Sequence, residues 1–159
     1  MKDTLFKIPL VQWVRRTIEK MQSMGASGVG AWNAAWLETY LELGGKSKET
    51  GRKGCPRSAA YGLWCLGLIA GGGKPRQDYP IPRVDRELGK NAAYAAIAID
   101  LLQAAAIPED HELLWSRVRR RYIELTGELP ATTDQGAVKV ASILFRSGQL
   151  ALRPDHGPA

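Results

Sequence analysis

The chain has 159 residues, of which 45% are hydrophobic and 24% charged, a composition typical of one soluble globular domain. Its 22 basic and 16 acidic residues leave a net charge of +6, which favours anionic partners without requiring nucleic acid. No run approaches the roughly 20 apolar residues of a membrane-spanning helix, and the charged start at Lys2 and Asp3 does not resemble a signal peptide. With only 2 cysteines, the sequence predicts a cytoplasmic protein.

Apolar residues recur at three- and four-residue steps through most of the chain, which is the spacing of amphipathic helices. No segment shows the alternation and β-branched bias of a strand. We therefore predict an all-α protein, with a single compact domain over residues 1–152 and a frayed tail at 153–159. The predicted helices, about six in number, cover residues 9–24, 28–43, 56–66, 85–106, 110–126 and 134–147.

Glycine and proline mark the expected breaks between these helices. Gly67 predicts a left-handed helix end in which Leu68 packs back on Leu63. Residues 46–53 are polar and charged, so we expect a loop there. Residues 71–82 are rich in glycine and proline, which predicts a long central loop that separates two halves of the domain.

A faint internal repeat agrees with this division into halves. Five positions match at the same spacing, namely Ala60 with Ala141, Leu63 with Leu144, Trp64 with Phe145, Gly67 with Gly148 and Ile69 with Leu150. Any buried helix that ends in a glycine would show this pattern, and we prefer that explanation to a duplication.

Cys55 is the strongest candidate for a reactive group. It precedes Pro56 at the start of a predicted helix, where the helix dipole and unpaired N–H groups lower the pKa of a thiol. Arg52, Lys53 and Arg57 add positive potential. A nucleophile also needs a base, and the 2 histidines fall in another helix and in the tail. We favour a structural role in a tight turn and keep a small enzyme with Cys55 as nucleophile as an alternative.

No cofactor or metal site is predicted. If residues 56–65 are helical, Cys55 and Cys65 lie about 15 Å apart at roughly 1.5 Å per residue, too far for a disulfide. The cysteines and histidines lack the spacing of zinc ligands. The glycines before Lys74 follow a helix rather than a strand, and Pro75 blocks a following helix, so they do not form a phosphate-binding loop.

Two basic clusters remain as candidate binding surfaces. The first lies in the predicted helix 110–126 and consists of Arg117, Arg119, Arg120 and Arg121. The second precedes the predicted helix 56–66 and consists of Arg52, Lys53 and Arg57. On a helix, Arg117, Arg120 and Arg121 share one face, which could contact phosphates or an acidic protein surface.

Acidic neighbours and the absence of interleaved aromatic residues favour a protein partner over nucleic acid. We therefore expect a non-enzymatic helical module that recognises another macromolecule, a protein, through a basic face. The alternative is a nucleic-acid-binding protein, which includes an inhibitor of a nucleic-acid-handling complex.

Several short motifs resemble those of a known family. The most specific is Lys53-Gly54-Cys55-Pro56-Arg57, and the other matches are Ala59, Gly62-Leu63, Gly67-Leu68, Asn91, Tyr94, Ala95, Leu114-Trp115, Asp134, Val138 and Leu144. With these motifs the chain resembles an uncharacterised bacterial family of small proteins. The resemblance implies no activity, but it implies a shared site or structural lock at Lys53, Cys55, Asn91 and Asp134. The predicted binding residues are therefore Arg52, Lys53, Arg57, Asn91, Arg117, Arg120, Arg121 and Asp134.

Overall fold

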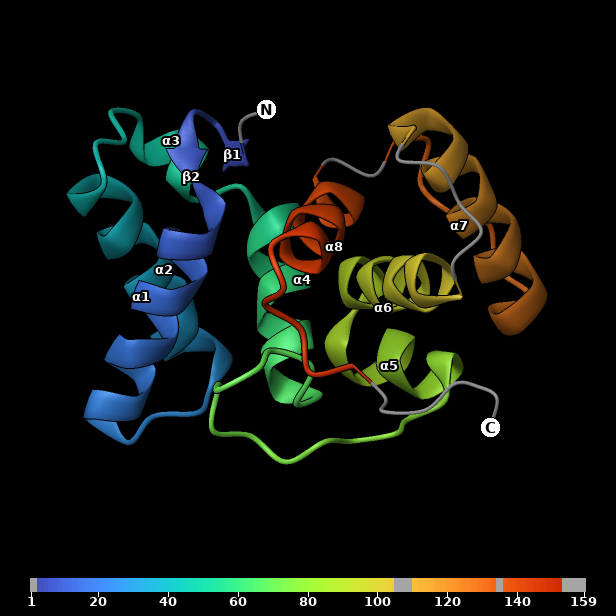
Figure 1. Ribbon diagram of the computed structural model, residues 1–159, viewed down its shortest axis with the longest axis horizontal. Coiled ribbons are helices and arrows are strands. Elements are labelled where there is room, and N and C mark those ends of the chain that lie inside the picture. The colour runs from blue at the N-terminus through green and yellow to red at the C-terminus, as the bar shows by residue number, and fades with distance from the viewer. Residues whose placement is uncertain (1–2, 105–109, 134–135, 153–159) are drawn as a thin grey trace.

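The computed structural model describes residues 3–104, 110–133 and 136–152. Its elements in chain order are β1 (Thr4–Leu5), β2 (Ile8–Pro9), α1 (Leu10–Met24), α2 (Val29–Glu42), α3 (Lys48–Gly51), α4 (Gly54–Cys65), α5 (Ile81–Leu88), α6 (Lys90–Gln103), α7 (His111–Thr126) and α8 (Ala137–Arg146) (Figure 1). One continuous hydrophobic core joins residues from Leu5 to Leu150. The predicted all-α fold and single compact domain are confirmed.

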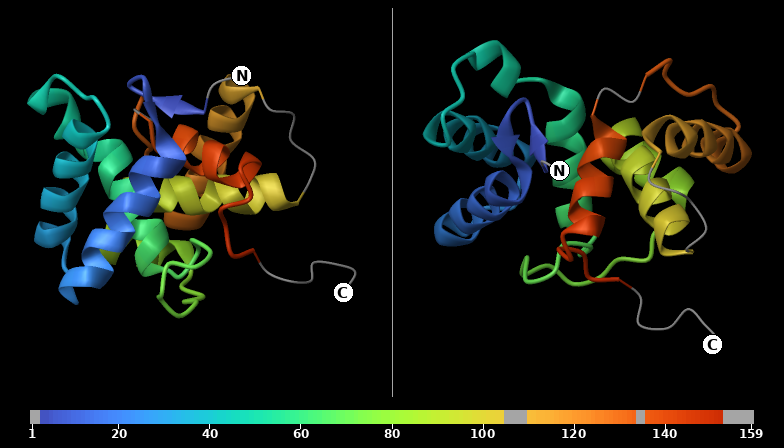
Figure 2. Two further views of the ribbon diagram at one scale, coloured as in Figure 1. Left: turned by 60° about the vertical axis from the view of Figure 1, so that its left-hand side comes forward. Right: turned by 45° about the horizontal axis from the view of Figure 1, so that its top comes forward.

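Helices α1 and α2 form a pair that lies against α4 and α8 on one side of the domain (Figures 1 and 2). An aromatic cluster joins this pair to α4. Trp13 stacks on Trp36 with ring centroids 4.3 Å apart, and Trp32 stacks on Trp64 of α4 at 5.2 Å. The buried Trp13 indole donates to the Trp36 carbonyl at 3.0 Å. Because its ring N–H has a partner, Trp13 buries a large apolar area without leaving its own donor unpaired.

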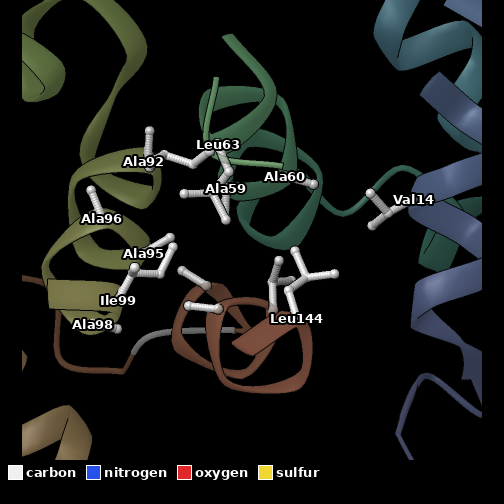
Figure 3. Packing of buried hydrophobic residues seen from close by; sticks show 14 of the residues in the cluster. Val14, Ala59, Ala60, Leu63, Ala92, Ala95, Ala96, Ala98, Ile99 and Leu144 are labelled. Carbon is white, nitrogen blue, oxygen red and sulfur yellow. The ribbon is translucent and has the colours of Figure 1, made fainter. Parts of the chain in front are cut away.

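The alanine-rich helix α6 is the centre of the domain. All residues 92–99 are buried, and α4, α5, α7 and α8 pack around them. Figure 3 shows alanines of α6 facing Ala59 and Leu63 of α4. A Cβ atom added at Gly62 would collide with the side chain of Ala92. Small residues therefore allow α4 and α6 to approach closely, and a helix that is apolar on all sides fits this central position.

The third predicted helix ends as its glycine indicates. Gly67 has a φ angle of 71°, and the N–H of Leu68 donates to the Leu63 carbonyl at 3.0 Å. This is the Schellman arrangement that the sequence predicts. The central loop that follows is held in place, because the side chains of Trp64 and Gln22 both donate to the Gly72 carbonyl, at 2.8 and 3.0 Å.

The prediction of one helix over residues 85–106 is wrong. Gly89, with a φ angle of 98°, turns the chain between α5 and α6 and caps both helices. The predicted loop at 71–82 also ends too late, because α5 already begins at Ile81 with Pro82 in its first turn. Proline suits that position since the first helical N–H groups have no partner within the helix.

Two further local predictions fail. Within residues 46–53, predicted as a loop, the chain forms the single-turn helix α3, whose start Ser47 caps by accepting the N–H of Thr50. The predicted absence of strands also fails at the N-terminus, where β1 and β2 pair in an antiparallel hairpin. Helix α8 begins at Ala137, and the predicted start at residue 134 lies outside the described residues. None of the helices in the described ranges is long and apolar enough to cross a membrane.

Candidate functional site

A cleft of about 440 Å³ lies where α4 and α8 begin. Figure 2 shows the N-terminal hairpin close to the starts of both helices. We call this space the α4–α8 cleft, and it is lined by Leu5, Phe6, Lys53, Gly54, Cys55, Pro56 and Gly136. The most specific sequence motif, Lys53 to Pro56, thus meets two segments that lie far away in the sequence.

Two helix N-termini meet at this cleft. Lys53 is the N-cap of α4 and Gly136 is the N-cap of α8. Gly136 has a φ angle of 107°, and a Cβ atom on it would lie 3.4 Å from the Cβ of Pro56. The glycine therefore permits the left-handed conformation, and Pro56 lies within ordinary van der Waals distance of an added Cβ. Since aligned peptide dipoles place partial positive charge at each N-terminus, both helices contribute positive potential to the cleft.

The hairpin supplies the opposite wall through a strained turn. Phe6 and Lys7 connect the paired residues Leu5 and Ile8, with φ angles of 53° and 67°. Two positive φ angles characterise a type I′ turn, which normally carries Asn and Gly because other side chains are strained there. Phe6 keeps 36% of its surface exposed while it lines the cleft. Strained residues gather at functional sites, so this turn supports a function for the cleft.

The second basic cluster surrounds the start of α4. Lys7, Arg52 and Lys53 are exposed, and within the described part of the chain none of the three forms an ion pair. Arg57 is half-buried, and its Nε atom finds no hydrogen-bond partner among the described residues. Its guanidinium lies 3.7 Å from the position that a Cβ of Gly54 would take. Cationic side chains therefore reinforce the positive potential of the helix N-termini.

Cys55 lines the cleft, but the described lining offers it no histidine, aspartate or glutamate as a base. The described histidine, His111, lies at the start of α7. Cys55 and Cys65 are not joined in a disulfide, and they lie near opposite ends of α4. Burial raises the pKa of the Cys65 thiol, and the Tyr61 hydroxyl, which hydrogen-bonds to it, partly offsets this rise. The two thiols therefore sit in different environments.

Asn91, which the resemblance groups with Cys55, is not among the described residues that line the cleft. Asn91 is the second residue of α6, and its neighbour Ala92 contacts Gly62. Gly62 lies about 12 Å from Gly54 along α4, at roughly 1.5 Å per residue. Asp134 lies outside the described residues, so its place in a shared site stays a prediction.

The first basic cluster belongs to α7, which lies on the other side of the domain from the α1–α2 pair (Figure 1). We call this surface the α7 face, and its exposed residues are Arg117, Arg119, Arg120, Arg121 and Ile123. Arg121 pairs with Glu124 at 3.1 Å, whereas the other three arginines have no ion pair within the described ranges. Helix α7 packs on α5, α6 and α8, whereas the second basic cluster lies at the start of α4.

The sequence reasoning missed Leu5, Phe6, Lys7 and Gly136. The hairpin carries no Asn-Gly or Asp-Gly pair at its turn. Neither an alternating apolar pattern nor a typical turn sequence therefore predicts it. Gly136 was a usable signal, because a glycine just before an apolar helical stripe is compatible with an N-cap.

A family model described as a family of unknown function (DUF6979) matches residues 12–149. Neither curated proteins nor solved structures give a match to the chain. The matched range contains the α7 face and the cleft residues of α4 and α8, and it begins after the hairpin that carries Phe6.

Proposed function

The chain belongs to this family of unknown function, and from that premise we propose that it is a non-enzymatic helical module that binds another protein through the α7 face. We place it in the cytoplasm and expect the Lys53–Arg57 motif to be shared by bacterial members of the family. The observation that carries the proposal is that three exposed arginines of α7, Arg117, Arg119 and Arg120, have no ion pair within the described residues.

The α7 face combines the residue types that dominate protein interfaces. Arginine is enriched in interface hot spots because its guanidinium makes several directional hydrogen bonds while its stem packs against apolar groups. Arg120 lies one turn before Ile123, which is 43% exposed, so the two side chains share a patch of helix surface. Leu129, two residues beyond the end-capping Gly127, is 80% exposed. An acidic partner surface with a few apolar contacts would complement this face.

The same surface is less suited to nucleic acid. Proteins that bind single strands offer aromatic side chains on which bases stack, and the α7 face contains none. Glu112 and Glu124 are exposed on the same helix and would repel phosphate groups. These features favour a protein partner, and the test must be able to detect binding to nucleic acid instead.

The test is affinity capture from the native host by the wild type and by the triple variant Arg117→Gln, Arg119→Gln, Arg120→Gln, with and without nuclease. The proposal expects the wild type to retain the same protein after nuclease treatment and the triple variant to lose it. Loss of the captured protein on nuclease treatment would favour the nucleic-acid alternative.

A charge-matched variant controls for the loss of net charge. Lys46, Arg86 and Lys90 are exposed and lie outside the α7 face, and their triple replacement by glutamine removes the same charge. This control should capture the protein like the wild type. Equal loss in both triple variants would show that net charge, and not the α7 face, determines the interaction. Circular dichroism should show the same helix content in all three proteins.

A further inference from the structure

We propose that the α4–α8 cleft is a second binding site, separate from the α7 face, which takes a small organic anion with an apolar body. The inference rests on the described residues of the cleft, namely on its volume, its cations and its exposed phenylalanine. It does not depend on a protein partner, so it stands or falls independently of the function proposed above.

The size and lining of the cleft fit a small molecule. Its volume of about 440 Å³ falls in the range of roughly 300–1,000 Å³ that ligand pockets occupy. Leu5, Phe6 and Pro56 give it apolar walls, and Lys53 is the charged side chain among its described lining residues. Apolar walls with one charged group are the usual composition of a site that buries a ligand's body and orients its polar end.

The charge of the cleft selects an anionic end group. The Lys53 ammonium has no ion pair within the described residues, and the exposed Arg52 and Lys7 adjoin lining residues in the chain. The positive ends of the α4 and α8 dipoles add to these side-chain charges. Among the described lining residues there is no carboxylate, so within this part of the lining a carboxylate or phosphate ester group of the ligand would meet positive potential.

Phe6 selects an apolar body next to that anionic group. The strained type I′ turn holds the phenylalanine at the cleft wall with 36% of its surface exposed. A ligand ring or alkyl chain that packs against Phe6 and Pro56 would remove this apolar surface from water. A bare inorganic anion would not gain this contribution, so the body of the ligand is part of the recognition.

Cys55 offers a direct readout of occupancy, because it lines the cleft while Cys65 does not. The experiment uses the full chain with Cys65→Ser, which keeps a hydroxyl as partner for Tyr61. The rate at which neutral iodoacetamide modifies Cys55 is measured with octanoate, with phenyl phosphate, with the neutral analogues octanol and benzyl alcohol, and with inorganic phosphate. Each rate is compared with the rate of the same variant without added compound.

The proposal expects octanoate or phenyl phosphate to slow the modification of Cys55 in a saturable manner, and the alcohols and inorganic phosphate to have little effect. The two anions distinguish a carboxylate from a phosphate ester as the preferred end group. Lys53→Gln should lower the affinity for the protecting anion by roughly fivefold, as expected for loss of a charge contact near the surface. The matched variant Lys90→Gln should leave protection unchanged, and Phe6→Ala should weaken protection by both anions.

Three results would overturn the proposal: no protection by either anion, equal protection by the neutral alcohols, or the same protection in Lys53→Gln and Lys90→Gln. If Cys65→Ser does not fold, the wild type is titrated with the same compounds and followed by the amide signals of Gly54 and Gly136. Saturable shifts of both signals with octanoate or phenyl phosphate support the site, and unchanged signals refute it.

Discussion

Ile69 and Leu150 face each other in an isolated antiparallel bridge, each two residues beyond the glycine that ends a buried helix. Two hydrogen bonds flank the pair: Ala70 N–H donates to the Gln149 carbonyl at 2.9 Å, and Ala151 N–H donates to the Leu68 carbonyl at 2.8 Å. These bonds connect equivalent positions of the internal repeat in both directions, so the two helix ends are related by a local twofold arrangement.

This bridge closes the end of the domain opposite the α4–α8 cleft. Helices α4 and α8 start together at the cleft and end together at the bridge. Any buried helix that ends in a glycine would produce such a repeat. This explains the match in sequence but does not explain the backbone pairing. The reciprocal backbone pairing adds a structural reason for two similar helix ends, because each glycine turns the chain toward its counterpart.

Replacing Leu150 by alanine should lower the free energy of unfolding. Leu150 is only 9% exposed, and leucine-to-alanine changes in cores cost about 2–5 kcal/mol. We expect a loss of about 2 kcal/mol, near the lower end of this range, because Leu150 is among the least completely buried residues of the core. Leu152→Ala is the control, since Leu152 is 37% exposed and its change should stay within about 0.5 kcal/mol. Urea unfolding with an unchanged m-value measures both, and equal losses would show that the bridge region does not pack as described.

A pair of glycine-to-alanine variants tests the close packing of α4 on α6. Gly62→Ala should destabilise the protein by about 1–3 kcal/mol, because the new methyl group collides with Ala92. Gly30→Ala in α2 should instead stabilise it by about 0.4–1 kcal/mol, since nothing lies within 4 Å of the added Cβ and alanine restricts the unfolded chain. The midpoint of thermal unfolding should fall in Gly62→Ala and rise in Gly30→Ala. A stable Gly62→Ala protein would mean that α4 and α6 are further apart.

The sequence predicts α1, α7 and α8 well because each keeps part of its surface exposed. The stripes of α1, α7 and α8 alternate apolar and charged residues at the helical period, and their ends carry glycines. In α6 this contrast is lost, because the helix is buried on all sides and alanine gives no amphipathic stripe. The break at Gly89 was therefore hidden inside what reads as one continuous alanine-rich helix.

The candidate site was only half predictable. Lys53 and Cys55 stand out through motif and charge, and both line the cleft. The wall formed by Phe6 depends on tertiary contacts that hold two non-glycine residues at positive φ, which overrides local turn preference. Asn91 looked similar to Lys53 as a motif residue, but the direction in which α6 crosses α4 places its start near Gly62.

Alkaline titration should reveal Tyr61 as a late-ionising tyrosine. Burial, followed by its hydrogen bond with Cys65, raises the pKa of Tyr61 from 10.0 to about 12. Because the folded-state pKa lies above the unfolded value, this group stabilises the folded state fully below about pH 10 and loses that contribution as the pH rises toward 12. The absorbance of tyrosinate, compared between wild type and Tyr61→Phe, measures the ionisation. A difference spectrum that titrates near pH 10 would contradict the partly buried position of the ring.

The salt dependence of binding separates the two kinds of partner proposed for the α7 face. On duplex DNA each phosphate contact contributes about 0.9 to the slope of log affinity against log salt, so neutralising Arg117, Arg119 and Arg120 together would lower the slope by about 2–3. A protein partner should instead show a hot spot, in which one arginine dominates and salt acts mainly on the association rate.

We expect Arg120 to be that residue, because it lies beside the exposed Ile123 on the helix surface. Arg120→Ala should then weaken binding to the captured protein by about 2 kcal/mol, and Arg117→Ala and Arg119→Ala by less than about 1 kcal/mol each. Calorimetric titration at several salt concentrations measures the binding free energy of each variant and the slope of affinity against salt. Equal losses of binding free energy in the three single variants, with a proportional fall in this slope, would identify a phosphate backbone as the partner.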